Sequence, residues 1–520
     1  MGIPPFRCIT PALLASLLLG ACATHDPAKP SANTASTSRP APVDAYKLTN
    51  RLTWGATTAT LEQAESKGLQ AYINQQLHPG PASLPPVVQQ QIAAMTISQQ
   101  PLVQLATDME KQQKEVNATF ANDDDKKAAQ QAYQQEMNRL GREAATRHLL
   151  RALYSSNQVQ EQMTWFWLNH FNVHLYKANL RAMVGDYEDT ALRPYALGKF
   201  RDLLGAVAHH PAMLRYLDNE QNAAGRINEN YARELMELHT LGVGSGYSQQ
   251  DVQEMARILT GVGYSFNPDA PKLRKELQGD YVRKGLFEFN PNRHDYGPKT
   301  LLGQPIRSRG LAELDEALDR LAKHPATAHF ISRKLAQYWL SDEPPPALVE
   351  RMAQSFLRSD GDIAVTLQTL LTSPEFAQGA GEKFKDPMHY VVSAVRLAYD
   401  NKPILNVGPM LNWLNRMGEP LYGHQTPDGY ALDTAAWASP GQMATRFEIA
   451  KAIGSGNAGL FKTDGPQAVD KPAFPQMANA LYYRALGQTL GPNTQKALAE
   501  ATSPQEWNSF LLSSPELMHR

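Results

Sequence analysis

The chain has 520 residues, and its 50 lysines and arginines nearly balance its 51 aspartates and glutamates. Because phosphate binding needs a concentrated basic surface, this balance predicts no nucleic-acid partner. Hydrophobic residues make up 42% of the chain, which is enough for a sizeable core.

The first 22 residues have the pattern of a lipoprotein signal peptide. A short basic start precedes an apolar run, Pro11–Leu19, which is too short to span a bilayer and ends in small residues before Cys22. We therefore expect a signal peptide over residues 1–21 and lipidation of Cys22 after cleavage. An ordinary signal peptide followed by a chance cysteine is the alternative.

Cysteine usage limits the possible chemistry. Cys8 and Cys22 are the only cysteines, and Cys8 is removed with the signal peptide. A disulfide framework, a zinc–cysteine site and a cysteine nucleophile are therefore excluded. By analogy with bacterial lipoproteins, Cys22 would carry three acyl chains such as palmitate and hold the protein to the cell envelope. Ala23 in place of aspartate resembles the outer-membrane default.

The mature chain divides into a tether and a folded domain. Residues 22–44 are rich in Pro, Ser, Thr and Ala without apolar periodicity, which predicts a flexible tether. From residue 45 to residue 520 the pattern predicts a mainly α, multi-helix globular body. Apolar residues recur at helical spacing in Leu61–Leu77, Leu102–Phe120, Ala128–Tyr154 and Val159–Leu175.

Two regions of this body differ from the rest. The polar stretch 106–146 predicts two long helices that form a solvated hairpin. Residues 281–303 contain Phe287–Asn290 and Thr300–Gly303 on either side of a turn-rich segment, which predicts a small β-hairpin or ordered loop. Elsewhere, Ser248–Asp251 is a capping-box pattern, and Pro211, Pro325 and Pro374 stand where first turns of helices tolerate proline.

The block Asn228–Gly242 is the most specific motif of the chain, and it does not stand alone. Further motifs are Asn50–Gly55, Arg193–Leu204, Gly246–Val252, Ala256–Gly261, His294–Asp295, Lys299–Gly303, Ser373–Phe376 and Pro427–Tyr430. Together these blocks resemble the bacterial family known as domain of unknown function 1800, from about residue 45 to the C-terminus.

The resemblance implies a largely helical, exported protein that is often paired with a second protein similar to alkaline phosphatases and sulfatases. It supplies no reaction. At Leu168 this chain departs from the family, which usually has histidine there, so a role that needs both that histidine and His170 is in doubt.

The first candidate site is the segment Trp165–His174. His170 and His174 would share one face of a helix, as a metal pair does, but no third ligand stands at a diagnostic spacing, so we predict no metal. Trp165 and Trp167 could stack on a sugar, and Asn169 could bind it. The alternative is a buried helix whose polar side chains bond neighbouring backbone.

The second candidate is the helix after Asn228. Glu229, Asn230, Arg233, Glu234 and Glu237 lie on or near its polar face. If this face lines a cleft, the three glutamates are candidate acids and bases and Arg233 and Asn230 bind substrate. If it faces solvent, Arg233 and Glu237 form an ordinary helical ion pair.

The third candidate is His294 with Asp295, in a loop where a carboxylate could tune an imidazole, although a turn-stabilising Asp is an equal alternative. No serine elbow, phosphate loop or dinucleotide fingerprint is present, so no cofactor is predicted. Two functions remain open: a hydrolase of an envelope or extracellular polymer such as a glycan, and a non-catalytic lipoprotein that docks a phosphatase-like partner. Whether the chain is an enzyme stays undecided at this point.

Overall fold

The computed structural model describes residues 42–118, 123–379, 381–400, 402–462 and 474–520. Cys22, the predicted signal peptide and most of the predicted tether lie outside these residues. Within them the chain is mainly helical and has two small antiparallel sheets, which confirms the predicted fold class. In these ranges, no helix has the length and apolar character that crossing a membrane requires.

The described chain begins with five short helices. They are α1 (Pro42–Leu52), α2 (Thr58–Lys67), α3 (Leu69–Leu77), α4 (Pro86–Ala93) and α5 (Thr96–Gln99). The apolar pattern predicted continuous helix over Leu61–Leu77, but the chain breaks at Gly68, whose φ is +83°. Glycine adopts this conformation without steric cost. The helical spacing of apolar residues therefore continues in the sequence although the helix itself is interrupted.

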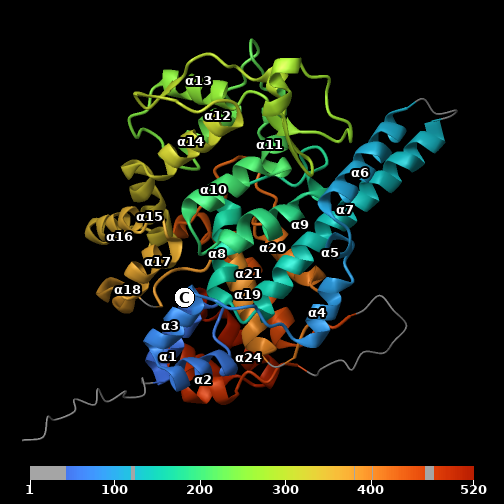
Figure 1. Ribbon diagram of the computed structural model, residues 1–520. Coiled ribbons are helices and arrows are strands. Elements are labelled where there is room, and N and C mark those ends of the chain that lie inside the picture. The colour runs from blue at the N-terminus through green and yellow to red at the C-terminus, as the bar shows by residue number, and fades with distance from the viewer. Residues whose placement is uncertain (1–41, 119–122, 380, 401, 463–473) are drawn as a thin grey trace, which may run out of the picture. The chain divides into compact units, whose positions relative to one another are not determined.

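Two longer helices, α6 (Leu102–Asn117) and α7 (Asp123–Tyr154), lie side by side over the region of the predicted hairpin (Figure 1). They share a hydrophobic cluster separate from the main core, to which Leu105, Met109, Tyr133 and Met137 belong. The last third of α7 instead enters the main core, where Leu149 and Leu153 are buried.

Helix α8 (Gln158–His170) is the most buried helix of the first half, and nearly all its side chains are shielded from solvent. The pattern predicted helix from Val159 to Leu175, but α8 ends at His170, because Phe171 leaves the helical conformation with ψ at 51°. His170 and His174 therefore do not share a helix face, contrary to the prediction.

Short turns and helices follow α8. They are η1 (Leu180–Ala182), α9 (Val184–Asp186), the π-helix η2 (Tyr187–Leu192), η3 (Arg193–Tyr195), α10 (Phe200–His209), α11 (Pro211–Tyr216), η4 (Asn219–Gln221), α12 (Asn230–Glu237) and α13 (Gln249–Ile258). Helix α13 opens with the predicted capping box, since Ser248 and Asp251 each accept a hydrogen bond from the other's backbone N–H.

The predicted insertion around 281–303 is present as short strands. Strands β1 (Val262–Tyr264), β2 (Val282–Lys284) and β3 (Phe287–Phe289) form an antiparallel sheet in the order β1-β3-β2. Strands β4 (Thr300–Leu301) and β5 (Gln304–Pro305) form a second pair, and the turns η5 (Lys275–Asp280) and η6 (Pro291–Arg293) connect the strands. Strand β1 was not predicted, because three residues are too few to show an alternating pattern.

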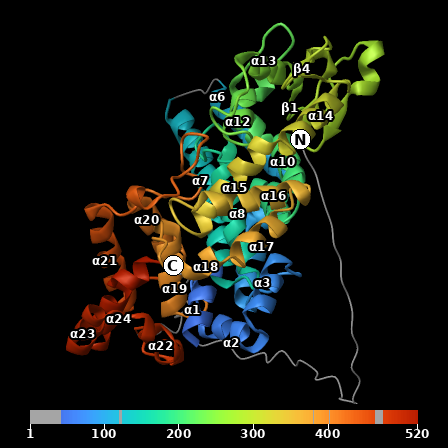
Figure 2. The ribbon, with the colours of Figure 1, turned by 90° about the vertical axis from the view of Figure 1, so that its left-hand side faces the viewer.

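The remaining chain is helical. It comprises α14 (Leu311–Ala322), α15 (Pro325–Trp339), α16 (Pro346–Arg358), α17 (Ile363–Leu371), α18 (Pro374–Gln378), α19 (Pro387–Ala398), α20 (Gly408–Arg416), η7 (Thr434–Ala436), α21 (Pro440–Gly454), α22 (Ala480–Arg484), η8 (Leu486–Thr489), α23 (Pro492–Glu500), α24 (Pro504–Ser513) and η9 (Pro515–Met518). Helices α21, α23 and α24 pack together (Figure 2). The predicted first-turn prolines Pro211, Pro325 and Pro374 begin α11, α15 and α18.

Buried charges join α8 to the π-helix. The Arg193 guanidinium bonds the carboxylates of Glu161 on α8 and Glu188 on η2. Glu188 also accepts a hydrogen bond from the Tyr422 hydroxyl at 2.6 Å and lies 2.9 Å from His148 Nδ1. Burial alone would raise the pKa of Glu188, but His148, Arg193 and the hydrogen bonds outweigh it and hold the pKa well below its usual range.

Candidate functional site

The aromatic residues of α8 are part of the core. Trp165 is 3% exposed and Trp167 is 0% exposed. The Trp167 indole N–H donates to the carbonyl of Ala196 at 2.9 Å, and the Trp165 ring lies 6.4 Å from that of Tyr430. Neither ring offers a face to solvent, so the structure gives no support to sugar stacking on these two side chains.

Asn169 holds a distant loop in place. Its Nδ2 donates to the carbonyl of Tyr430 at 2.9 Å, and its Oδ1 accepts from the Tyr430 N–H at 2.6 Å. Gly429 has φ +75°, and a Cβ there would lie 2.1 Å from the Asn169 carbonyl oxygen. Only glycine fits this approach, so the segment Pro427–Tyr430 is fixed against the end of α8.

The same loop carries three polar side chains in contact. Asn172 anchors its start, since Nδ2 donates to the carbonyls of His424 at 3.1 Å and Thr426 at 2.8 Å. The Thr426 hydroxyl donates to Asp428 Oδ1 at 2.5 Å, and His424 Nε2 lies 3.2 Å from that oxygen. Burial raises the pKa of Asp428, but hydrogen bonds from Thr426 and His424 lower it further, so its net pKa is below the usual value. Asp428 is therefore an ionised carboxylate at neutral pH.

His170 points from the end of α8 to a lysine on α15. Its Nδ1 lies 3.0 Å from Lys334 Nζ, and its Nε2 lies 3.1 Å from the carbonyl of His239. The carbonyl can only accept, so Nε2 carries the proton and Nδ1 accepts from the ammonium. Burial, and then the charge of Lys334, lower the pKa of His170 well below its usual value. His170 is thus a neutral imidazole that orients Lys334.

Lys334 lines a cavity of about 560 Å³, here called the Lys334 cavity, together with Glu237, Phe330, Arg333 and Gln337. Burial lowers the pKa of the Lys334 ammonium to about 8, while the charge of Asp428 opposes this shift. Its Nζ lies 5.6 Å from the centroid of the Phe330 ring. The cavity therefore combines an amine that titrates near neutral pH with a carboxylate and an aromatic ring.

The pKa of Glu234 is shifted in the opposite direction to that of Asp428. Burial raises the pKa of its carboxyl, and the charges of Glu237 and Asp428 raise it further, while Arg233 opposes them. A charge shifts the pKa of another group only when the two lie near one another, so Glu234, Glu237 and Asp428 are neighbours in the fold. The pKa of Glu234 is therefore raised above its ordinary value, while that of Asp428 is lowered below its own.

The other predicted residues of α12 lie along its outer side. The Arg233 side chain is 39% exposed and bonds Glu229 and Glu237, each at 3.2 Å. Asn230 donates to the carbonyl of Leu217 at 3.1 Å and so fastens the start of the helix. Glu237 belongs both to this ladder of charges and to the lining of the Lys334 cavity.

His294 and Asp295 lie in a separate cluster. The His294 side chain is 0% exposed, with Nε2 3.2 Å from Glu313 and Nδ1 2.8 Å from the carbonyl of Thr260. Asp295 accepts from Arg257 at 2.8 Å. Neither residue lines the Lys334 cavity, and their partners tie the loop to α13 and α14.

The structure thus brings some of the predicted site residues together and leaves others apart. Glu237 and Lys334 line one cavity, and His170 contacts Lys334 from behind it. Glu234 and Asp428 do not line this cavity, but the charge of Asp428 acts on both Glu234 and Lys334. Neither Lys334 nor Asp428 was a predicted site residue. The motif Pro427–Tyr430 was a signal for Asp428, whereas Lys334 had none, because its place depends on how α15 packs against α8. Among the described residues, no group of three or more His, Cys, Asp or Glu side chains could hold a metal ion.

Comparison with known proteins gives one match. The profile of the family described as "Protein of unknown function (DUF1800)" matches residues 47–519. No curated protein and no solved structure matches the chain.

Proposed function

The chain belongs to the DUF1800 family, and since this membership names no reaction, we propose from the geometry of the site that the protein is a hydrolase. Its substrate is an envelope or extracellular polymer such as a glycan. Glu234 is the general acid and Asp428 the general base. Lipid on Cys22 would hold the enzyme at the cell envelope.

The placement of these two carboxyl groups beside Lys334, whose direction His170 fixes, carries the proposal, and their opposite pKa shifts support it. The pKa of Glu234 is raised by burial and by neighbouring carboxylates, whereas that of Asp428 is lowered by the hydrogen bonds from Thr426 and His424. Hydrolysis of a glycosidic bond requires one carboxyl group that keeps its proton and one that is ionised. Two neighbouring carboxyls pushed apart in this way meet that requirement.

In the proposed reaction, each of the two carboxyl groups transfers one proton. Glu234 gives its proton to the leaving oxygen while the carbon–oxygen bond breaks. Asp428 takes a proton from the attacking water while the water oxygen bonds to the same carbon. Exchange with solvent then restores both groups.

Lys334 supplies the cation of the site. With a pKa of about 8, the ammonium is mostly protonated at pH 7, and its bond to the neutral His170 fixes its direction. The ammonium can donate to a substrate hydroxyl or to the leaving oxygen. The half-buried Phe330 provides an apolar surface beside this ammonium. His170 is a positioning residue, because it contacts Lys334 and does not itself line the cavity.

The test is turnover by the full-length protein in detergent. Peptidoglycan, chitin, β-glucan and α-glucan would be incubated with it, and release of reducing ends measured. We expect turnover of at least one polymer, and kcat about 10²- to 10⁴-fold lower in Glu234→Gln and Asp428→Asn, the range for loss of a general acid or base. The rate should fall as pH rises through the pKa of Glu234 and as pH falls through that of Asp428.

Glu448→Gln is the matched control, because Glu448 pairs with Arg416 on the surface, where both side chains are exposed. It should leave kcat unchanged. Absence of turnover on all four polymers, together with a phosphatase-like protein that co-purifies from the envelope at equal stoichiometry, would replace this proposal with the docking function.

A further inference from the structure

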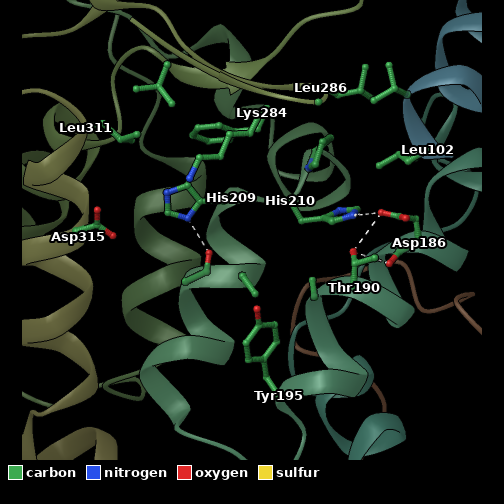
Figure 3. Close-up of a pocket in the computed structure, with 18 residues that line it drawn as sticks. Leu102, Asp186, Thr190, Tyr195, His209, His210, Lys284, Leu286, Leu311 and Asp315 are labelled. Atoms are coloured by element: carbon green, nitrogen blue, oxygen red, sulfur yellow. Dashed lines mark hydrogen bonds and ion pairs between the residues drawn. The ribbon is translucent and has the colours of Figure 1, made fainter. Parts of the chain in front are cut away.

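A second cavity, of about 590 Å³, lies between the π-helix η2, helices α10 and α11, and the β2–β3 hairpin (Figure 3). We call it the His209 cavity. Its size falls within the range of about 300–1,000 Å³ typical of small-molecule sites. Apolar side chains such as Leu102, Leu286 and Leu311 form part of its wall, and polar side chains enter it between them.

His209 presents a hydrogen-bond acceptor to this cavity. Its Nδ1 donates to the carbonyl of Gly205 at 2.7 Å, so the neutral ring has its lone pair on Nε2. Burial lowers the pKa of His209, which keeps the ring neutral. The Lys284 side chain extends toward this ring (Figure 3) and makes no ion pair in the described part of the chain. An acceptor and a cationic donor therefore stand side by side.

Asp186 presents a second acceptor. His210 Nδ1 accepts from the N–H of Ala212 at 3.1 Å, so Nε2 carries the proton and donates to Asp186 Oδ1 at 3.0 Å. The Thr190 hydroxyl donates to the Asp186 backbone carbonyl at 2.9 Å and shares this proton with Oδ1 at 3.2 Å. Both bonds engage Oδ1 and leave Oδ2 able to accept from a ligand.

Tyr195 adds a donor opposite these acceptors. Its hydroxyl points into the cavity (Figure 3) and has no hydrogen-bond partner among the residues that the structure describes. The half-buried ring also gives the cavity a flat apolar surface.

The backbone beside this cavity is also unusual. Thr190 and Ala191 of the wall belong to the π-helix Tyr187–Leu192, and Asp186 directly precedes it. π-helical turns are rare and occur often at functional sites. Here the turn brings Asp186 and Thr190 to the same cavity edge.

We infer that the His209 cavity is a saccharide-binding site, separate from the Lys334 cavity. Hydroxyl groups of a sugar both donate and accept, which suits the acceptors of His209 and Asp186 and the donors of Lys284 and Tyr195. The carboxylate of Asp186 disfavours a phosphate, and the polar groups of His209, Asp186, Lys284 and Tyr195 disfavour a wholly apolar ligand. The site would hold a polymer at a distance from the reacting bond, so it extends the proposed function without relying on Glu234.

The test measures binding with the Lys334 cavity disabled. Full-length Lys334→Met in detergent would be titrated calorimetrically with chitohexaose, cellohexaose and maltohexaose. We expect at least one to bind, and its affinity to fall at least tenfold when Ala206→Trp, which fills the cavity from α10, is added. Tyr195→Phe removes only a hydroxyl and should weaken binding without disturbing the fold.

The matched control is Ala499→Trp, on the exposed side of α23, which should leave the affinity unchanged. The inference is overturned if no hexasaccharide binds, or if Ala206→Trp and Tyr195→Phe both bind as tightly as their parent. Polymer hydrolysis by Ala206→Trp, measured in parallel with the wild type, separates the two proposals. Turnover by the wild type, when no hexasaccharide binds to Lys334→Met, refutes the inference and leaves the proposed function intact.

Discussion

His239 shows how much a single buried side chain can contribute to pH dependence. It lies at 0% exposure after α12, its ring packs 5.0 Å from that of Phe171, and neither ring nitrogen has a hydrogen-bond partner in the described chain. Burial, and then the charge of Lys334, lower the pKa of His239 to about 3. The folded protein therefore keeps this ring neutral where the unfolded chain protonates it.

The sign of the effect follows from this difference. Below pH ~6.5, the unperturbed value, the unfolded chain binds a proton that the folded chain does not, so the free energy of unfolding decreases as pH falls. The loss is at most about 1.4 kcal/mol per pH unit and ends near the folded pKa of about 3. Urea unfolding at pH 7.5 and pH 5.0 should show that His239→Phe loses less stability than the wild type.

His78→Phe is the control, because His78 is exposed at the end of α3. It should retain the wild-type pH dependence. An equal loss of stability in His239→Phe and the wild type would show that His239 does not titrate on unfolding.

At this scale the sequence identified some site residues and not others. Glu234 and Glu237 could be predicted, because helical spacing alone places them on the polar face of α12. His170 belongs to the first predicted site, but its two ring nitrogens are hydrogen-bonded to the carbonyl of His239 and to Lys334. The role of Lys334 depends on contact with a helix more than 160 positions earlier, from α15 to α8, and no local pattern reports that.

At the scale of elements, Arg193 fastens the π-helix to α8. Its side chain is 13% exposed and bonds Glu161 and Glu188, whose side chains are 4% and 3% exposed. Arg193→Met would leave two buried carboxylates without their cation. We expect a loss of about 3–5 kcal/mol in the free energy of unfolding, as for other buried pairs broken on one side.

Urea unfolding at pH 7 measures this loss, and Arg416→Met is the matched control. Arg416 pairs with Glu448 where the two side chains are 43% and 63% exposed, and such surface pairs contribute about 0–1 kcal/mol. A loss in Arg193→Met no greater than in Arg416→Met would mean that the buried network does not stabilise the fold.

Elements were predictable where local chemistry decides them. The capping box at Ser248 and the first-turn prolines marked real helix starts, because these signals act within one turn. Helix ends were less predictable. Gly68 divides one predicted helix through its left-handed backbone. Another ends where Phe171 leaves the helical conformation, just before Asn172 bonds the loop at His424 and Thr426, a contact that only the tertiary fold provides.

At the scale of the whole molecule, we predict that Cys22 decides where the protein resides. In cells, Cys22→Ala should move the full-length protein from the membrane fraction to the soluble fraction and abolish palmitate labelling, because stable anchoring requires more than one acyl chain. Cys8→Ala, within the predicted signal peptide, should change neither result. Membrane retention of Cys22→Ala would rule out this anchor.

Such an anchor would set the working distance of both cavities. A tether of about 20 residues has a root-mean-square reach of roughly 25 Å on the estimate for flexible chains. Under the proposed function, the polymer substrate would then be one that lies close to the same membrane.

The paired helices α6 and α7 have a consequence for protein engineering. Their outer part packs around its own small cluster, with Met109 and Met137, while only the last third of α7 reaches the main core. The residues that line the Lys334 cavity all lie outside that outer part, and so do Glu234 and Asp428. A reporter domain fused to that outer part should therefore leave the packing of the main core intact.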